Sequence, residues 1–231
     1  MWQKKLKKTI FTLNIGDYAP EITKLTYPLI KRYAQKIGAD FYIIKERKFP
    51  KFPLEYEKLQ IYELAQKMEN DWNIYIDSDA LIHPALMDIT NHLPKNTVLH
   101  FMADLASNRF KYDRYFLRDG RNIGSSNWLA VASDWCIDLW KPLDDITPKE
   151  TIANIYPTVW ESSGIVTPDH LIDDYTLSRN IAKYGLKFES FVNLLNQFGQ
   201  PRIEYFWHFY NVPEEKKVAQ IKEALKRWGL T

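Results

Sequence analysis

Two aspartates separated by a single serine, Asp77-Ser78-Asp79, follow directly after an apolar run at 74–76. Side chains two residues apart in an extended chain point the same way, so an extended backbone would place both carboxylates on one side. Such carboxylates repel each other unless a cation or hydrogen-bond donors compensate them. Hard divalent cations bind carboxylate oxygens and commonly bridge them to substrate phosphates. The spacing therefore predicts a divalent-cation site; the simpler alternative is a solvated turn whose Ser78 or Asp79 caps a following helix.

The elements that must position this motif alternate between the periodicities of strands and helices. In chain order the sequence predicts a strand at 9–15, a helix at 20–37, a strand at 41–44, a loop at 48–53, a helix at 55–68, strands at 73–76, 98–102 and 128–131, a helix at 169–183, a strand at 187–191, an extended segment at 204–210 and a helix at 214–228. Gly38 is expected to end the first helix in the left-handed conformation. The β-α-β-α-β order of the first half predicts an α/β fold with parallel strands, and such sheets bind ligands at the carboxyl ends of their strands.

The composition limits the classes of partner. The chain has 31 basic and 29 acidic residues and a net charge of +2, which argues against nucleic-acid binding through a basic stripe. The single cysteine, Cys136, excludes an intramolecular disulfide and favours a cytoplasmic location. We expect no transmembrane segment, because no apolar run approaches the roughly 18 residues that a span needs. The basic run at 4–8 offers weak peripheral contact with anionic lipid, although such runs are usually solvated.

Several short motifs occur in an order that resembles a known enzyme family. They are Tyr-Ala-Gln-Lys-Ile-Gly at 33–38, Lys58, the Asp-Ser-Asp motif, and Asn122-Ile123-Gly124-Ser125 followed by Trp135 and Trp140. With this order the chain resembles GT-A-fold glycosyltransferases, closest to the GMA12/MNN10-type galactosyl- and mannosyltransferases and more distantly glycogenin-like enzymes. The resemblance implies one GT-A domain over 1–231, with a Rossmann-like mixed central sheet flanked by helices and the amphipathic helix at 213–229 packed on it.

The resemblance also implies a donor site. The residues expected to bind the nucleotide-sugar are Thr12, Asn14, Tyr18, Lys58, Asp77, Ser78, Asn122 and Gly124. Asp79 would bind Mn²⁺ or Mg²⁺ directly, Asp77 would contact the metal or the ribose, and His208 would complete the metal site. Without the resemblance, a histidine within the aromatic run 206–210 is more readily interpreted as a packed core residue.

A second acidic pair, Asp173-Asp174, resembles the catalytic acid segment of many GT-A enzymes. In an inverting enzyme Asp174 would be the general base for the acceptor hydroxyl; in a retaining enzyme this region would stabilise an oxocarbenium-like centre. The alternative is that a helix N-terminus simply favours acidic residues. The resemblance favours a retaining hexosyltransferase that uses a UDP-sugar rather than a GDP-sugar and a glycan or other hydroxyl acceptor, with the loop at 156–168 shaping the acceptor site.

Two other function classes stay open. A nucleotidyltransferase would also need paired carboxylates and a metal, but Ile15-Gly16-Asp17-Tyr18 is not the glycine-rich phosphate loop that such enzymes usually carry. A non-catalytic carbohydrate-binding or scaffold protein could keep the same fold, and loss of metal binding would distinguish it. Other histidines, among them His170, have no partner that can be read from the sequence.

Overall fold

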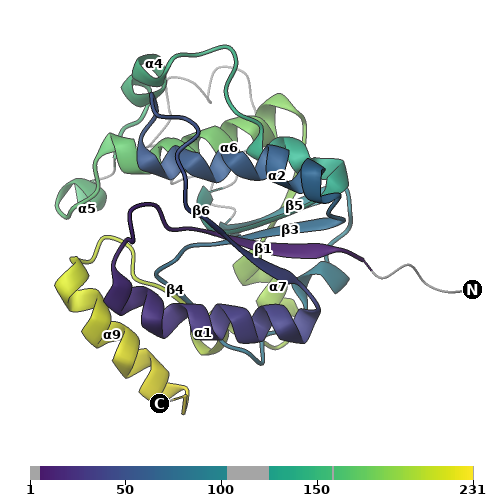
Figure 1. The fold of residues 1–231 in the computed structure, drawn as a ribbon, viewed down its shortest axis with the longest axis vertical. Helices are drawn as coiled ribbons and strands as arrows, with labels where there is room; N and C mark the ends of the chain where they lie inside the picture. Colours follow the sequence, from purple (N-terminus) through teal and green to yellow (C-terminus); the bar gives the residue numbers. More distant parts are fainter. Residues whose placement is uncertain (1–5, 103–124, 158, 231) are drawn as a thin grey trace, which may run out of the picture.

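The computed structural model describes residues 6–102, 125–157 and 159–230. A six-stranded sheet in the order β2-β1-β3-β6-β5-β7 forms the centre of the fold (Figure 1). Its strands are β1 (Lys8–Leu13), β2 (Asp40–Ile44), β3 (Trp72–Ile76), β5 (Thr97–Met102), β6 (Ser125–Ser133) and β7 (Lys187–Ser190). Neighbouring strands pair in parallel except at β6, which runs antiparallel to β3 and β5. The sheet is therefore mixed, and β3, whose end carries the Asp-Ser-Asp motif, lies inside it.

Helices cover both faces of this sheet. In Figure 1, α2 (Ile61–Met68) and α6 (Ile172–Lys183) lie above it, and α1 (Pro20–Ile37) and α7 (Phe191–Gln197) lie below. The remaining helical segments are η1 (Leu54–Gln60), η2 (Ile89–Asn91), η3 (Asp134–Trp140), α4 (Pro148–Ala153), α5 (Val159–Ser162), η4 (Pro168–Leu171) and α8 (Arg202–Tyr205).

Strand β3 is buried on both of its faces. Ile74 and Ile76 pack into the core that α1 and α7 cover, whereas Tyr75 packs into the core beneath α2 and α6. A central strand covered on both sides needs apolar residues at every position rather than at alternate ones. This explains the apolar run before the motif. The chain leaves the core where that run ends, between Ile76 and Asp77.

The first helix and its end match the sequence prediction. Helix α1 begins at Pro20 and ends at Ile37, and Gly38 follows with a φ of 67°. The Gly38 N–H donates to the carbonyl oxygens of the last turn, which would otherwise be left without partners. Glycine adopts this left-handed conformation without the steric cost of a Cβ atom.

Three predicted elements differ from the structure. The helix expected at 169–183 is divided into the 3₁₀ segment η4 and the α-helix α6. The helix expected at 55–68 is divided into the 3₁₀ segment η1 and the α-helix α2. The buried Glu57 carboxylate of η1 accepts hydrogen bonds from the N–H groups of Lys48 (2.8 Å) and Phe49 (2.9 Å), which ties the preceding loop to this tighter turn. The segment expected to be extended at 204–210 instead begins with the helical turn α8, because Pro201 starts a turn before the chain extends.

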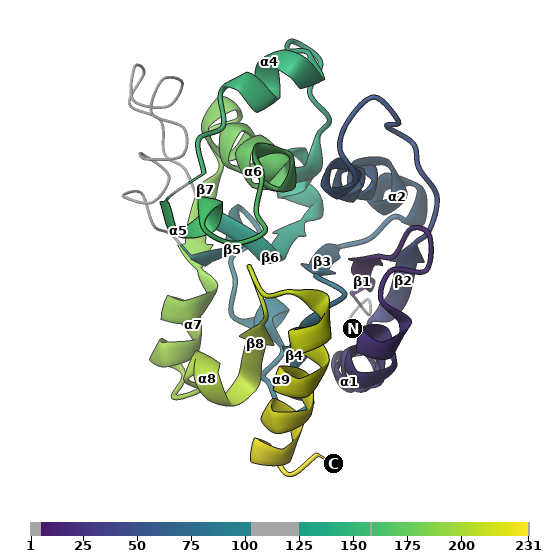
Figure 2. The same cartoon turned by 90° about the vertical axis from the view of Figure 1, so that its left-hand side faces the viewer.

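The C-terminal part of the chain completes a second, smaller layer. Strands β4 (Ala80–Ile82) and β8 (Phe206–His208) form a two-stranded antiparallel sheet. Helix α9 (Glu214–Arg227) lies beside this sheet and α1 (Figure 2), and its Ile221 and Leu225 share a buried cluster with Ile22 and Leu29. In the described part of the chain, none of the helices combines the length and apolarity needed to cross a membrane.

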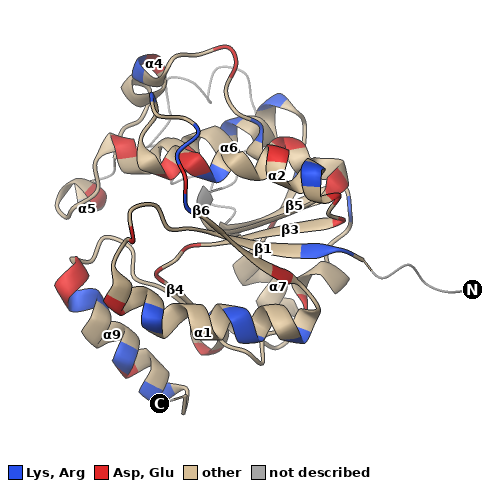
Figure 3. Ribbon diagram, in the orientation of Figure 1, with Lys and Arg blue, Asp and Glu red and all other residues tan. Residues whose placement is uncertain are grey.

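Charged residues of both signs are interspersed along the helices in Figure 3. Helix α9 has Glu214 and Glu215 in its first turn and Lys226 and Arg227 in its last. This order complements the helix dipole, which favours negative charge at the N-terminus and positive charge at the C-terminus. One lysine of α9, however, lies inside the protein.

Candidate active site

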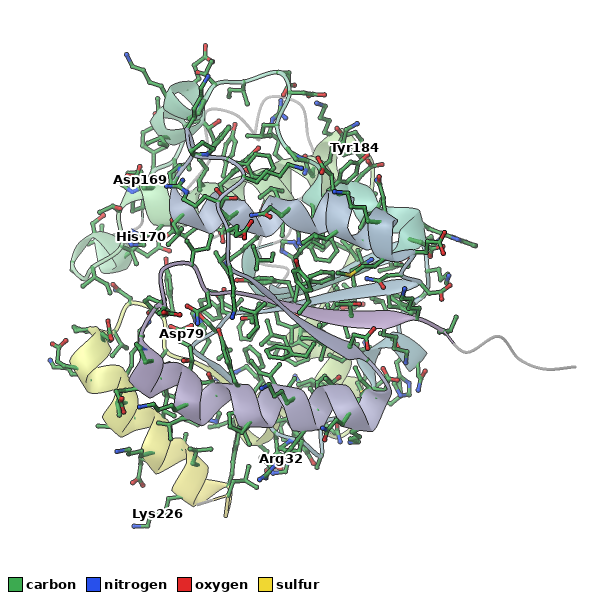
Figure 4. The ribbon with its side chains drawn as sticks, viewed as in Figure 1. Arg32, Asp79, Asp169, His170, Tyr184 and Lys226 are labelled. Atoms are coloured by element: carbon green, nitrogen blue, oxygen red, sulfur yellow. The ribbon has the colours of Figure 1, made fainter. Side chains whose placement is uncertain are left out.

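A cavity of about 270 Å³ opens where β1 and β3 end, and α6, β8 and α9 close its sides. Asp77, Ser78 and Asp79 line it together with Asp173, Asp174 and His208. Asp79 and His170, both labelled in Figure 4, lie on the same side of the molecule, and Tyr184 lies at the opposite end of the upper helical layer. The position is the ligand-binding edge that the strand order predicted.

The Asp-Ser-Asp motif forms a turn, so the expectation of an extended backbone is wrong. The Ala80 N–H donates to the Asp77 carbonyl oxygen at 3.0 Å, and β4 begins at Ala80 without an intervening helix. The Ser78 carbonyl oxygen accepts a 2.6 Å hydrogen bond from the buried Thr26 hydroxyl of α1. The turn is thereby anchored to α1, and it brings the two carboxylates to one place by curvature rather than by strand alternation.

The pairing of β4 with β8 brings His208 to these carboxylates. Ala80 lies opposite His208 in the antiparallel register, so the histidine is beside the turn although it is more than a hundred residues away in the sequence. His208 Nε2 lies 3.0 Å from Asp79 Oδ1 and 3.4 Å from Asp77 Oδ2. One ligand atom from each of the three residues lies within 4.8 Å of the other two. Two carboxylates and one imidazole are a suitable donor set for a divalent transition metal such as Mn²⁺.

Asp77, Asp79 and His208 are the candidate metal ligands and are called the metal-ligand cluster below. Lys58 joins this cluster to the second acidic pair. Its Nζ lies 3.0 Å from Asp77 Oδ1, also forms an ion pair with Asp173, and lies 4.7 Å from the centre of the Tyr75 ring. Burial lowers the pKa of the Lys58 ammonium, but the charges of Asp173 and Asp77 outweigh it and raise the pKa above its usual value. The Tyr75 hydroxyl donates a 2.6 Å hydrogen bond to the same Asp77 oxygen. Lys58 thereby fixes the orientation of the Asp77 and Asp173 carboxylates relative to each other.

Lys217 is a site residue that the sequence analysis missed. This lysine of α9 is buried and forms an ion pair with Asp79. Burial lowers its pKa, but Asp79, and to a smaller degree Tyr18, raise it above the usual value. In the sequence it is one of several lysines on an amphipathic helix, and such residues usually face solvent. The sequence did hold one indication that Lys217 belongs to the site. The segment that contains His208 leads directly into α9, so a residue in the first turns of α9 is expected to lie near this histidine.

Aromatic rings form one wall of the cavity beside the histidine. The rings of Trp128 and His208 stack with centroids 4.4 Å apart, and Tyr210 lies 5.1 Å from Trp128. The Tyr210 hydroxyl donates a 2.8 Å hydrogen bond to the buried carboxylate of Glu161 on α5. The stack holds the imidazole plane in place, which orients Nε2 toward the two aspartates.

Comparison with known proteins identifies the fold of this chain and not its activity. No family model matches the sequence, and no curated protein matches it. Among solved structures it is similar to a glycosyltransferase involved in the glycosylation of the major capsid of PBCV-1, with a TM-score of 0.53 and 13% identity over 93% of this chain and 98% of that chain. The GT-A fold class is confirmed. A mutant of a Drosophila β-1,4-galactosyltransferase 7, in complex with manganese, UDP-Gal and xylobiose, aligns with a TM-score of 0.42 and 12% identity over 89% of this chain and 72% of that chain.

The other predicted site residues lie at various distances from this cluster. Tyr18 lines the cavity and is 36% exposed, whereas Thr12 and Asn14 lie against Tyr27 of α1, outside the cavity lining. The Asp173 carboxylate accepts a 2.8 Å hydrogen bond from the Asp174 N–H, and both residues are buried at the start of α6. Predicted contacts of Asn122 and Gly124 lie outside the described residues.

The charges around His208 make a specific prediction about pH. Burial lowers the pKa of His208, but Asp79 and Asp77 outweigh it and raise the pKa above 6.5, whereas those aspartates have lowered pKa values and stay ionised. A cation must displace the imidazole proton, so Mn²⁺ affinity is expected to fall by about tenfold per pH unit below the pKa of His208. Calorimetric Mn²⁺ titrations at about pH 6 and about pH 8 measure this. His208→Ala should bind more weakly with a flatter pH dependence; a flat wild-type profile would contradict the assignment.

Proposed function

We propose that this protein is a metal-dependent glycosyltransferase that transfers a hexosyl group from a nucleotide-sugar to a glycan or other hydroxyl acceptor. A UDP-sugar is the preferred donor and a GDP-sugar the second. The observation that carries the proposal is the cluster of Asp77, Asp79 and His208 at the carboxyl end of β3, within a cavity of a glycosyltransferase-like fold.

The buried end of the cavity is suited to a diphosphate. Asp77, Asp79 and His208 would hold the divalent cation, which would supply charge neutralisation for the departing nucleoside diphosphate. Lys217 is a second positive group at the same place, already desolvated and held by Asp79. Tyr18, beside Lys217 at the cavity edge, is placed to contact the nucleotide after β1. Anion recognition by a cation and a fixed ammonium group is stronger in a desolvated site than in water.

The acidic pair is suited to the reacting sugar. Asp173 is held by Lys58 and by the Asp174 N–H, so its carboxylate is a fixed negative group facing the cavity. A fixed carboxylate stabilises positive charge that develops at the anomeric carbon without having to reorganise during the reaction. We assign this role to Asp173 in a retaining transfer, and we place Asp174 where the acceptor hydroxyl gives up its proton.

Thermal unfolding with nucleotides tests the proposal. Wild-type protein is measured with UDP and with GDP, each with and without Mn²⁺. A ligand at about 100 times its Kd adds about 2.7 kcal/mol, which raises Tm by several degrees. A shift that needs both Mn²⁺ and UDP, followed by hydrolysis of a UDP-hexose, is the expected result. Metal-dependent nucleotide binding without any hydrolysis or transfer across a panel of sugar donors would favour a non-catalytic carbohydrate-binding protein instead.

A further inference from the structure

We propose that Glu55 and His170 form an acceptor subsite at the mouth of the cavity that binds a neutral hexose through its hydroxyl groups. This inference rests on the proposed glycosyltransferase function and names the class of acceptor. The two side chains face each other from η1 and η4, with Glu55 Oε1 and His170 Nε2 3.9 Å apart, and both line the cavity.

Glu55 and His170 are more exposed to solvent than the end of the cavity where the nucleotide-sugar donor would bind, which is called the donor end below. His208 and Asp79 are 6% and 10% exposed, whereas Glu55 and His170 are 30% and 47% exposed. The cavity is therefore closed at the metal-ligand cluster and open at Glu55. A donor must occupy the closed end for its diphosphate to reach the cluster, so the next molecule to enter meets Glu55 and His170.

The histidine is oriented by its own loop. Its Nδ1 accepts a hydrogen bond from the Thr167 N–H at 3.2 Å and lies 2.8 Å from the Thr167 hydroxyl. Because a backbone N–H donates to Nδ1, the proton of the neutral ring is on Nε2, the atom that faces Glu55. A hydrogen-bond donor, the Nε2–H of His170, and a hydrogen-bond acceptor, the Glu55 carboxylate, thus face each other across the cavity mouth.

The gap between the two groups suits a sugar hydroxyl. A separation of 3.9 Å is too long for a direct hydrogen bond but shorter than two hydrogen bonds of about 2.8 Å each. One hydroxyl oxygen can accept from Nε2–H and donate to the carboxylate at the same time. The second carboxylate oxygen can accept from a neighbouring hydroxyl, and paired hydroxyls on adjacent carbons are typical of hexoses.

Apolar side chains complete the subsite. Leu54 and Ile165 line the cavity beside the pair and are 37% and 49% exposed. Exposed aliphatic groups next to a fixed polar pair match a sugar ring, which has C–H groups on its face and hydroxyls on its edge. Ile165 is held by a 2.8 Å hydrogen bond from its N–H to Asn211, so this wall is anchored to the segment that follows His208.

The charge at the mouth excludes acidic sugars. Glu55 has a raised pKa because burial, and then the nearby Asp173, disfavour its ionised form, while His170 and Lys58 act in the opposite direction. A uronic acid would add a further carboxylate at a place that already disfavours the ionised form of Glu55 and lies near Asp173, so it would meet the same electrostatic penalty. A neutral hexose is therefore preferred over a hexuronic acid.

Saturation-transfer NMR on the full chain with UDP and Mg²⁺ present tests the subsite without requiring turnover. The probes are the methyl glycosides of glucose, galactose and mannose, and methyl glucuronide. Wild-type protein is expected to bind at least one hexoside and not the glucuronide. Glu55→Gln and His170→Asn should each weaken hexoside binding by about tenfold, since each leaves a sugar hydroxyl without its partner. Glu55→Gln should also reduce the discrimination against the glucuronide, because it removes one of the carboxylates near the mouth.

Controls separate this inference from the proposed function. Glu21→Gln alters a carboxylate that is 71% exposed on α1 and paired with Lys24, and it should leave hexoside binding unchanged. Nucleotide binding is measured on every variant as a readout of the donor end and of folding. Unchanged hexoside binding in both subsite variants, with UDP binding intact, would overturn the subsite and leave the proposed function standing. Absence of UDP binding in the wild type would overturn the proposed function itself.

Discussion

Replacing Asp79 by asparagine is expected to lower kcat/KM by about 100- to 1,000-fold, the range seen when one charged or dipolar group that stabilises a transition state is removed. The Asp79 carboxylate has two tasks in the proposed site. It offers one ligand atom to the divalent cation, beside His208 Nε2 at 3.0 Å, and it holds Lys217 in place. Asparagine keeps the shape of the side chain but not the negative charge that both tasks require.

Metal binding and nucleotide binding should respond to different degrees in this variant. Mn²⁺ titration should show weakened binding, because a neutral amide oxygen is a poorer ligand than a carboxylate. Nucleotide binding without metal should fall less, because the Lys217 ammonium loses its ion pair with Asp79 but is still a cation on a side chain that lines the cavity. If Asp79→Asn bound Mn²⁺ and turned over substrate like the wild type, the metal site would have to lie elsewhere.

Asp134→Asn is the matched control for this experiment. Asp134 is a 43% exposed carboxylate that pairs with Lys95 at 2.9 Å, outside the cavity lining. Exposed ion pairs contribute little, about 0–1 kcal/mol, so the control should keep both stability and activity. Assays at a temperature well below the Tm of each variant separate lost activity from lost folding.

The local elements of the fold could be predicted because short-range chemistry determines them. Pro20 and Gly38 mark the two ends of α1, and the apolar run of β3 indicates a strand buried on both faces. The antiparallel insertion of β6 into the sheet could not be read from periodicity, because parallel and antiparallel buried strands have similar sequences. Pairing direction depends on contacts between residues far apart in the chain.

The parts of the candidate site whose residues are adjacent in the chain could be predicted from the sequence. The parts that only tertiary pairing brings together could not. Asp77 and Asp79 are visible as a motif, although they meet through a turn rather than an extended strand. His208 reaches them only through the register of β4 with β8. Lys217 and the Glu55–His170 pair come from three further elements, and each of these residues by itself resembles an ordinary surface charge.

The largest effect on stability is expected for Lys58→Met. Methionine fills similar volume but leaves Asp77 and Asp173 buried without the ammonium that lies between them. Removing one partner of a buried ion pair costs about 3–5 kcal/mol, because the remaining charge is left uncompensated. For a chain of this size, Tm should fall by roughly 6–20 °C. Urea unfolding followed by tryptophan fluorescence measures the change in the free energy of unfolding.

The pH dependence of this variant identifies the cause of the loss. In the wild type the pKa of Asp77 is lowered from 3.8, so its contribution to stability is present above that value and is lost as the pH falls. Without Lys58, burial would raise the pKa of the Asp77 carboxyl, so the folded state would take up a proton and the variant would become relatively more stable in mild acid. Asp173→Asn added to Lys58→Met should recover part of the loss at neutral pH, by about 0.5–3 kcal/mol. A loss that is independent of pH and additive with Asp173→Asn would mean that Lys58 stabilises the fold by packing alone, and that it does not couple the metal-ligand cluster to the acidic pair.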